Sequence, residues 1–258
     1  MLPEPYYSHA GITIYHADCR AILPHVTADV VVTSPPYNTL PLSARPSGLH
    51  AERRSGVNQW MTRASLGYSD NMPESDYQSW LCGIMHLCSD RVRGLVWMNH
   101  KVRYRDGAAV HPIRFIDLPI YAEVVWDRRV SMALNCKRFA PSHEGLWAFG
   151  VPHVWNDEYN TRMTVWAIPF DRDPNDHPCA FPLEIARRPI LSSSDEDDTI
   201  LDPFMGSGTT LVAAKQLGRK AIGIEIEERY CEIAAKRLAQ EVLPLEPEAP
   251  IPTQQTFL

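Results

Sequence analysis

The sequence predicts an α/β fold in which a doubly wound, mostly parallel β-sheet carries helices on both faces. Two observations indicate this fold. Short apolar runs typical of strands alternate along the chain with longer helical patterns. One of these runs, Val30-Val31-Val32, is apolar at every position, which is typical of a strand that is buried on both faces of a parallel sheet.

Seven strands and three main helices are expected. The strand candidates are residues 11–16, 29–33, 94–99, 122–126, 145–149, 198–204 and 220–226. Helical patterns begin at Ser75, which can cap the helix over 75–92, at Ser207, with Gly218 closing that helix, and at Glu227.

One folded domain is expected over residues 1–242, because 258 residues with 45% hydrophobic content can bury a single large core. Residues 39–74 are loop-rich and too long for an idle connection, so they are predicted to be a mobile functional loop. The tail over 243–258 is rich in proline, has little to bury and is expected to be disordered.

Composition argues for a soluble cytoplasmic protein with no metal site. The six cysteines form no CxxC pair, the N-terminus lacks the features of a signal peptide, and no apolar run reaches the length of a membrane span. The net charge is −6, yet residues 45–138 hold 14 basic side chains against 9 acidic ones. This basic middle segment is compatible with a nucleic-acid face, although solvated surface arginines are the ordinary alternative.

The run of valines ends abruptly in Ser34-Pro35-Pro36-Tyr37. In open α/β sheets, ligands bind outside the carboxyl ends of the strands. We therefore expect chemistry at these four residues.

A second motif, residues 202–210 (DPFMGSGTT), reads as a strand end, a glycine turn and a helix start. It has neither the lysine of a Walker loop nor the third glycine of a dinucleotide loop. Asp202 would repel phosphate but suits an ammonium and a sulfonium, and Glu225 ends the next strand, where it could bind a ribose. Asp18 also follows a strand, so all three acids could converge on one crevice; the alternative is that each caps a helix.

These motifs, in this order, resemble the β class of amino-type DNA methyltransferases. TSPPY at 33–37 resembles the catalytic tetrapeptide region, and 202–210 resembles the S-adenosylmethionine motif that follows it in this permuted class. IYHADCRAIL, EVVWDRR, SHEGLWAFG, DHPCAFPLEIARRPI and AIGIEIEERYCEIAAKRL resemble further segments of the family, so the resemblance covers most of the chain. It implies a class I methyltransferase fold, a Rossmann-like sheet with one reversed strand.

The resemblance also assigns site residues. Asp18 would meet the cofactor adenine and Glu225 the ribose hydroxyls. The glycine-turn residues would hold the methionine moiety, with two phenylalanines packing nearby; these positions are Asp202, Gly206, Ser207, Gly208, Thr209, Phe204 and Phe181. For Phe181, packing of a helix is the alternative role.

The tetrapeptide has a chemical rationale. An exocyclic amine is a poor nucleophile because its lone pair is delocalised into the base. Ser34 Oγ and the Pro35 carbonyl could accept its two protons and turn the lone pair toward the methyl group, with the prolines fixing the geometry. Tyr37 offers a face on which a flipped base can stack. The resemblance implies the target atom as well: a serine at the first position is commoner in the cytosine-N4 members of the family, so cytosine N4 is favoured, with adenine N6 as the alternative.

Other functions are weighed against this one. Cytosine C5 methylation needs a cysteine nucleophile, and the only Pro-Cys, at Cys179, lies far from the tetrapeptide in sequence. RNA methylation and a non-catalytic DNA-binding module remain as alternatives.

Contacts with DNA are predicted in three basic pairs, Arg53 with Arg54, Arg128 with Arg129, and Lys137 with Arg138. His143 and Glu144 could line the base pocket. Residues 151–176 are a short candidate segment for target recognition, so the 39–74 loop could read bases instead. The terminal QQTFL at 254–258 loosely resembles peptides that dock on bacterial sliding clamps, with a plain tail as the alternative.

Overall fold

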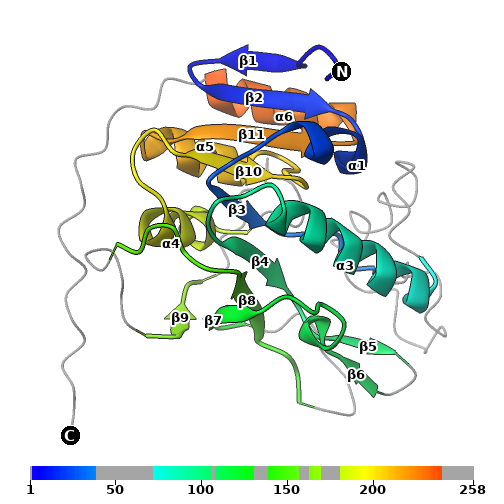
Figure 1. Ribbon diagram of the computed structural model, residues 1–258. Helices are drawn as coiled ribbons and strands as arrows, with labels where there is room; N and C mark the ends of the chain where they lie inside the picture. Colours follow the sequence, from blue (N-terminus) through cyan, green and yellow to red (C-terminus); the bar gives the residue numbers. More distant parts are fainter. Residues whose placement is uncertain are drawn as a thin grey trace, which may run out of the picture.

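The computed structural model describes residues 2–38, 72–105, 108–130, 139–156, 163–169 and 181–239. Nine strands form one sheet in the order β1-β2-β11-β10-β3-β4-β8-β7-β9 (Figure 1). Their bounds are β1 (Tyr7–His9), β2 (Ile12–His16), β3 (Val30–Thr33), β4 (Val96–His100), β7 (Ile120–Asp127), β8 (His143–Phe149), β9 (Val165–Ala167), β10 (Thr199–Asp202) and β11 (Lys220–Glu225). All seven predicted strands are present.

The predicted mostly parallel sheet is confirmed. Strands β2, β11, β10, β3 and β4 run parallel to one another, and β8 runs against both β4 and β7. Edge strand β1 is a second reversed strand, where one was expected. It joins β2 through Ala10 and Gly11, whose φ values are 47° and 79° as a tight hairpin requires. Alanine is uncommon at such a φ, so this turn could not be predicted from its residues.

The helices lie on both faces of the sheet (Figure 1). The longer ones are α3 (Glu74–Ser89), α4 (Leu183–Ser193), α5 (Thr209–Gln216) and α6 (Glu228–Ala239), and the short ones are α1 (Cys19–Ile22), η1 (Leu23–His25) and η4 (Pro112–Arg114). Val30 and Val32 pack in the core cluster under α4, α5 and α6, while Val31 packs in the cluster under α1 and α3. The valine run is therefore buried on both faces, as predicted.

Helix α3 differs from its prediction at both ends. It begins at Glu74, and Pro73 is the residue at its N-cap position, with no side-chain cap. Ser75 lies inside the first turn and its hydroxyl donates to Asp76 at 3.1 Å, so the predicted cap is wrong. The predicted helix from Ser207 likewise starts later, at Thr209, because Ser207 and Gly208 belong to the preceding turn.

Three further features bear on the predicted organisation. Of the 151–176 segment, residues 165–167 form β9, which pairs with the edge of β7. Strands β5 (Arg103–Arg105) and β6 (Ala108–Val110) form a separate hairpin. Most of the predicted 39–74 loop and the whole 243–258 tail lie outside the described residues. Within the described ranges, no helix is long and apolar enough to cross a membrane.

Candidate active site

The predicted catalytic and cofactor residues meet at one edge of the sheet. Strands β2, β11, β10 and β3 are parallel neighbours. Their carboxyl ends therefore bring Asp18, Glu225, Asp202 and Ser34 to the same side of the molecule, as the sequence predicted. Thr33, the residue before Ser34, donates its hydroxyl proton to Asp202 Oδ1 at 2.7 Å. This hydrogen bond joins the strand that ends in the tetrapeptide to the glycine-turn motif.

Asp202 is a buried carboxylate, 2% exposed. Burial raises the pKa of its carboxyl to about 6, against the lowering effect of hydrogen bonds from Thr210, Thr33 and the Phe204 amide. Among the described residues, no basic side chain forms an ion pair with it. A cationic ligand would supply the positive partner that the ionised carboxylate of Asp202 lacks.

The two glycines of the turn have different roles. Gly208 has φ 86°, and a Cβ there would meet the Ala234 Cβ at 2.8 Å, so its lack of a side chain lets α6 pack closely. Gly206 has φ 51°, and a Cβ there would meet nothing within 4 Å. Open space beside Gly206 leaves its backbone accessible to a ligand.

Several side chains of the cofactor motif are held by other parts of the protein. Ser207 Oγ and Thr209 Oγ1 accept hydrogen bonds from Arg237 of α6, at 3.0 and 3.3 Å. Glu225 accepts bonds from the backbone N–H groups of Gly206 and Glu227, at 3.0 and 2.9 Å, and burial raises the pKa of its carboxyl. Arg237, which was not predicted, therefore fixes the turn on α6.

Asp18 caps α1, which was the alternative role considered for it. Its carboxylate accepts from the Arg20 amide at 2.9 Å and pairs with the Arg20 guanidinium. The hydrogen bond from the Arg20 side chain lowers the pKa of Asp18. Phe204 stacks at a tilt on Trp80 of α3, with ring centroids 5.5 Å apart, and Phe181 packs at the margin of the core just before α4.

The tetrapeptide side chains converge on Asn99, the penultimate residue of β4. Asn99 Oδ1 accepts from Tyr37 OH at 2.9 Å and from Ser34 Oγ at 3.4 Å, and the two hydroxyls lie 3.1 Å apart. Asn99 Nδ2 donates to the Gly145 carbonyl at 3.2 Å, which turns Oδ1 toward the tetrapeptide. When the Ser34 hydroxyl donates a hydrogen bond to Asn99, its oxygen lone pairs remain free to accept from a substrate amine.

Pro36 and Tyr37 are held by a second group of side chains. The Pro36 carbonyl accepts from Tyr77 OH at 2.6 Å, and that hydroxyl also lies 2.8 Å from His100 Nε2. Burial lowers the pKa of His100 to about 3, so its imidazole is neutral at physiological pH. The Tyr37 ring lies 4.7 Å from the His100 ring and 4.9 Å from Lys101 Nζ. These contacts fix the plane of the tyrosine that was predicted to stack on a base.

Glu144 extends the network from the tetrapeptide into a pocket. Its carboxylate accepts from Arg128 at 3.0 Å and lies 3.1 Å from Tyr37 OH, whose single proton can be donated to Glu144 or to Asn99, and the residue is only 7% exposed. It lines a pocket of about 130 Å³ together with His143. Arg128 faces this pocket, whereas Arg129 is exposed and pairs with Asp127 at 3.2 Å. Arg53, Arg54, Lys137 and Arg138 lie outside the described residues.

Two arginines of the basic middle segment are paired inside the protein. Both terminal nitrogens of Arg103 donate to Glu74 at 2.7 Å, and Arg105 also contacts that carboxylate. Burial raises the pKa of Glu74, but these bonds and one from Gln78 outweigh it and hold the pKa at about 2. The sequence charge therefore overstates the surface available for binding phosphate.

Asn38 and Met72 lie side by side at the two ends of residues 39–71. The Met72 amide donates to Asn38 Oδ1 at 2.7 Å, and Asn38 Nδ2 donates to the Met72 carbonyl at 3.0 Å. Both ends of that segment therefore start next to Tyr37.

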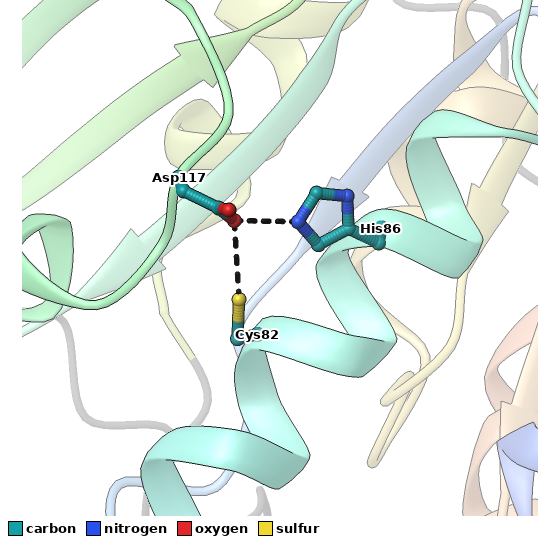
Figure 2. Close-up of side chains that lie close together, drawn as sticks. All are labelled: Cys82, His86 and Asp117. Atoms are coloured by element: carbon teal, nitrogen blue, oxygen red, sulfur yellow. Dashed lines mark hydrogen bonds and ion pairs between the residues drawn. The ribbon is translucent and has the colours of Figure 1, made fainter.

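Two groups of potential metal ligands lie elsewhere. In Figure 2, Cys82 and His86 project from successive turns of α3 toward Asp117. His86 Nε2 lies 2.5 Å from Asp117 Oδ1, whereas two ligands of one tetrahedral zinc lie about 3.4 Å apart, so the pair is arranged as a hydrogen bond. Asp29, His153 and Asp198 form the second group, where the Arg93 guanidinium already pairs with both carboxylates at 3.0 Å.

The strand order, the glycine turn and the carboxylates at one sheet edge define an α/β enzyme with the class I methyltransferase fold. A family model described as DNA methylase, for N6 and N4 methyltransferases, matches residues 28–236. The chain belongs to this family, and it is a DNA amino-methyltransferase.

Individual relatives agree with this assignment. The type II methyltransferase M.ScaI of Streptomyces caespitosus is 28% identical over 286 residues, covering 93% of this chain and 85% of its own. The orphan methyltransferase M.BamHII of Bacillus amyloliquefaciens is 42% identical over 93 residues, covering 33% of this chain and 35% of its own.

Solved structures share the fold. The PvuII DNA methyltransferase, described as cytosine-N4-specific, has a TM-score of 0.70 at 18% identity, covering 93% of this chain and 90% of its own. M1.HpyAVI in its SAM complex has a TM-score of 0.59 at 24% identity, covering 89% of this chain and 100% of its own.

Proposed function

We propose that the chain is a permuted, β-class methyltransferase that transfers the methyl group of S-adenosylmethionine to N4 of a cytosine flipped out of DNA. The observation that carries this proposal is the hydrogen bond from Thr33 to Asp202, which joins the tetrapeptide strand to the glycine-turn motif. In the permuted order the tetrapeptide precedes that motif in the chain, as it does here.

The cofactor is assigned to the crevice between β2, β11 and β10. Asp202 would bind the ammonium of the methionine moiety, and the open side of Gly206 would face the ligand. Glu225 would exchange one of its backbone partners for the ribose hydroxyls, and Asp18 would meet the adenine. Phe204, stacked on Trp80, and Phe181 would supply apolar contacts, while Ser207, Gly208 and Thr209 would keep the turn on α6.

The chemistry assigned to the tetrapeptide is direct transfer. The sulfur–methyl bond breaks as the nitrogen–methyl bond forms, the sulfonium becomes a neutral thioether, and the amine nitrogen loses one proton. Ser34 Oγ and the Pro35 carbonyl would accept from the amine, and Pro36 would keep that carbonyl aimed. Asn99 is an amide and cannot take the proton. The proton would pass through Ser34 and Tyr37 to Glu144, a buried carboxylate that can take it.

Cytosine N4 is favoured over adenine N6 for two reasons. Ser34 stands where a serine is commoner in cytosine-N4 enzymes, and the PvuII enzyme, whose fold is similar, is described as cytosine-N4-specific. The test is to express the protein in a bacterial host that lacks DNA methylation and to digest plasmid DNA to nucleosides. N4-methylcytosine is expected; N6-methyladenine alone would refute the base assignment.

DNA binding is assigned to the 39–74 loop with Arg53 and Arg54, and to Arg129, Lys137 and Arg138. The Asn38–Met72 contact supports this role for the loop, because it places the residues at both ends of the 39–71 segment beside Tyr37. Deleting residues 45–65 should abolish DNA methylation while S-adenosylmethionine still binds, as measured by calorimetry. Loss of cofactor binding as well would contradict this division of labour.

Two smaller assignments complete the proposal. The bacterial relatives support a bacterial or phage-like protein that works in the cytoplasm. The QQTFL tail is proposed to dock on a sliding clamp; capture by purified clamp that is unchanged after removal of residues 254–258 would end that idea.

A further inference from the structure

A polar pocket opens beside the tetrapeptide, between the end of β4, the η4 region and strands β7 and β8. Its volume is about 130 Å³. Its polar lining includes Lys101, His111, Glu123, Arg128 and Glu144, and Trp147 forms an apolar part of the wall. Because Glu144 lies within hydrogen-bond distance of Tyr37 OH, at 3.1 Å, this pocket adjoins the predicted catalytic residues.

Two buried polar atoms of the lining residues have no hydrogen-bond partner within the described part of the protein. They are Arg128 Nε and His111 Nδ1. A buried donor without an acceptor destabilises the protein, and more so when it is charged. A ligand in the pocket could supply the acceptor that Arg128 Nε lacks.

Arg128 is oriented by two fixed acceptors. One terminal nitrogen donates to Glu144 and the other to the Pro141 carbonyl, both at 3.0 Å. A guanidinium has five N–H donors, so three remain, including the one on Nε. The side chain is 15% exposed, and it therefore presents a cationic donor to the pocket rather than to bulk solvent.

We infer that this pocket holds the flipped base and that Arg128, oriented by Glu144, selects cytosine by donating to its O2 and N3 acceptors. The inference rests on the proposed function and adds the residue that decides the base. When the amine of cytosine lies at the tetrapeptide, N3 and O2 follow along the same edge and match the parallel donors of a guanidinium. Adenine in the same position offers N1 followed by a C–H group, which leaves one donor unpaired.

The test uses the full-length protein and an oligonucleotide that contains a methylated site mapped on plasmid DNA. Arg128→Met is combined with Glu144→Gln, so that no buried charge is left unpaired, and the double variant is compared with Glu144→Gln alone, which keeps Arg128. Relative to Glu144→Gln, we expect kcat/KM for DNA to fall about 10- to 100-fold in the double variant, as loss of a bidentate base contact does, with unchanged affinity for S-adenosylmethionine. Lys236→Met is the control, because Lys236 is 73% exposed on α6 and pairs with Glu232 at 2.6 Å, and it should stay within about twofold of wild type.

A base analogue separates recognition of O2 from a structural role. A 2-aminopyridine C-nucleoside keeps the amine and ring nitrogen of cytosine but lacks O2, and it is assayed above its own pKa. Wild type should methylate it more slowly than cytosine, and the double variant should treat the two substrates alike. An equal penalty in both proteins would overturn the inference.

The possible outcomes separate the role of Arg128 from the methylation reaction itself. Methylation of cytosine by wild type, with the same loss for the analogue in every variant, would refute the role of Arg128 and keep the reaction. Methylation of adenine alone would refute the cytosine pocket and keep the enzyme class. No transfer to DNA, with cofactor bound, would refute both.

Discussion

Replacing Ser34 by alanine is expected to lower the rate of methyl transfer by about 10²- to 10³-fold, the loss typical of removing one transition-state hydrogen-bond group. The Ser34 hydroxyl is held by Asn99 and Tyr37 and would accept from the reacting amine. The measurement is single-turnover transfer of a tritiated methyl group to plasmid DNA. Affinity for S-adenosylmethionine should change by less than about twofold, because Ser34 belongs to the base side of the crevice.

Ser75→Ala is the matched control for this experiment. Its hydroxyl contacts only Asp76 at the start of α3, so the variant should transfer methyl groups at the wild-type rate. Full activity of Ser34→Ala would mean that the amine is oriented by other groups and that the tetrapeptide has been assigned the wrong role.

Replacing Asp202 by asparagine is expected to weaken the binding of S-adenosylmethionine by about 10- to 100-fold, as loss of a charge-assisted hydrogen bond does. Asparagine keeps the shape and can still accept from Thr33, so the change removes the charge and leaves the packing. Calorimetric titration measures the effect. Asp197→Asn is the control, since Asp197 is exposed and asparagine tolerates its φ of 65°.

The same carboxyl predicts how binding and stability depend on pH. Because the pKa of Asp202 is raised to about 6 in the free protein, affinity for the cationic cofactor should fall as pH drops below 6, and should stay flat in Asp202→Asn. The ionised carboxylate of Asp202 destabilises the cofactor-free fold, because burial favours the protonated form. The stabilising contribution of the protonated carboxyl is therefore fully present below pH 3.8 and is lost as pH rises through 6. Asp202→Asn should therefore melt at or above the wild-type temperature at pH 7 without cofactor. A lower melting temperature would contradict the raised pKa.

The parts of the fold that follow from local pattern were predictable. Strands β2, β3, β4, β10 and β11 are short apolar runs in the sequence, and such runs are typical of buried strands. Strand β9 and the β5–β6 hairpin were missed because each of these strands is three residues long. Arg103 and Arg105 of β5 pair with Glu74 of α3, which is a contact that no local pattern encodes.

The residues of the candidate site also fall into two groups, those that a local pattern predicts and those that only packing brings together. Ser34, Asp202 and Glu225 were predictable, because a polar residue ending a buried strand lies at the ligand edge of a parallel sheet. Asn99 stands at the end of the predicted strand 94–99 and could have been found by that rule. Tyr77 could not, because it lies 41 residues from Pro36, which it contacts, and only the packing of α3 brings it there. Glu144 was a candidate for the base pocket, but its contact with Tyr37, 107 residues away, depends on the packing of β8.

We propose that the tetrapeptide and the glycine turn together methylate an exocyclic amine in DNA. To test this, the purified protein is incubated with tritiated S-adenosylmethionine and unmodified DNA, with RNA of the same sequence in parallel, and the labelled nucleosides are analysed. We expect label in N4-methylcytosine from DNA and none in RNA. Label confined to RNA, or no transfer to DNA by protein that binds the cofactor, would contradict it.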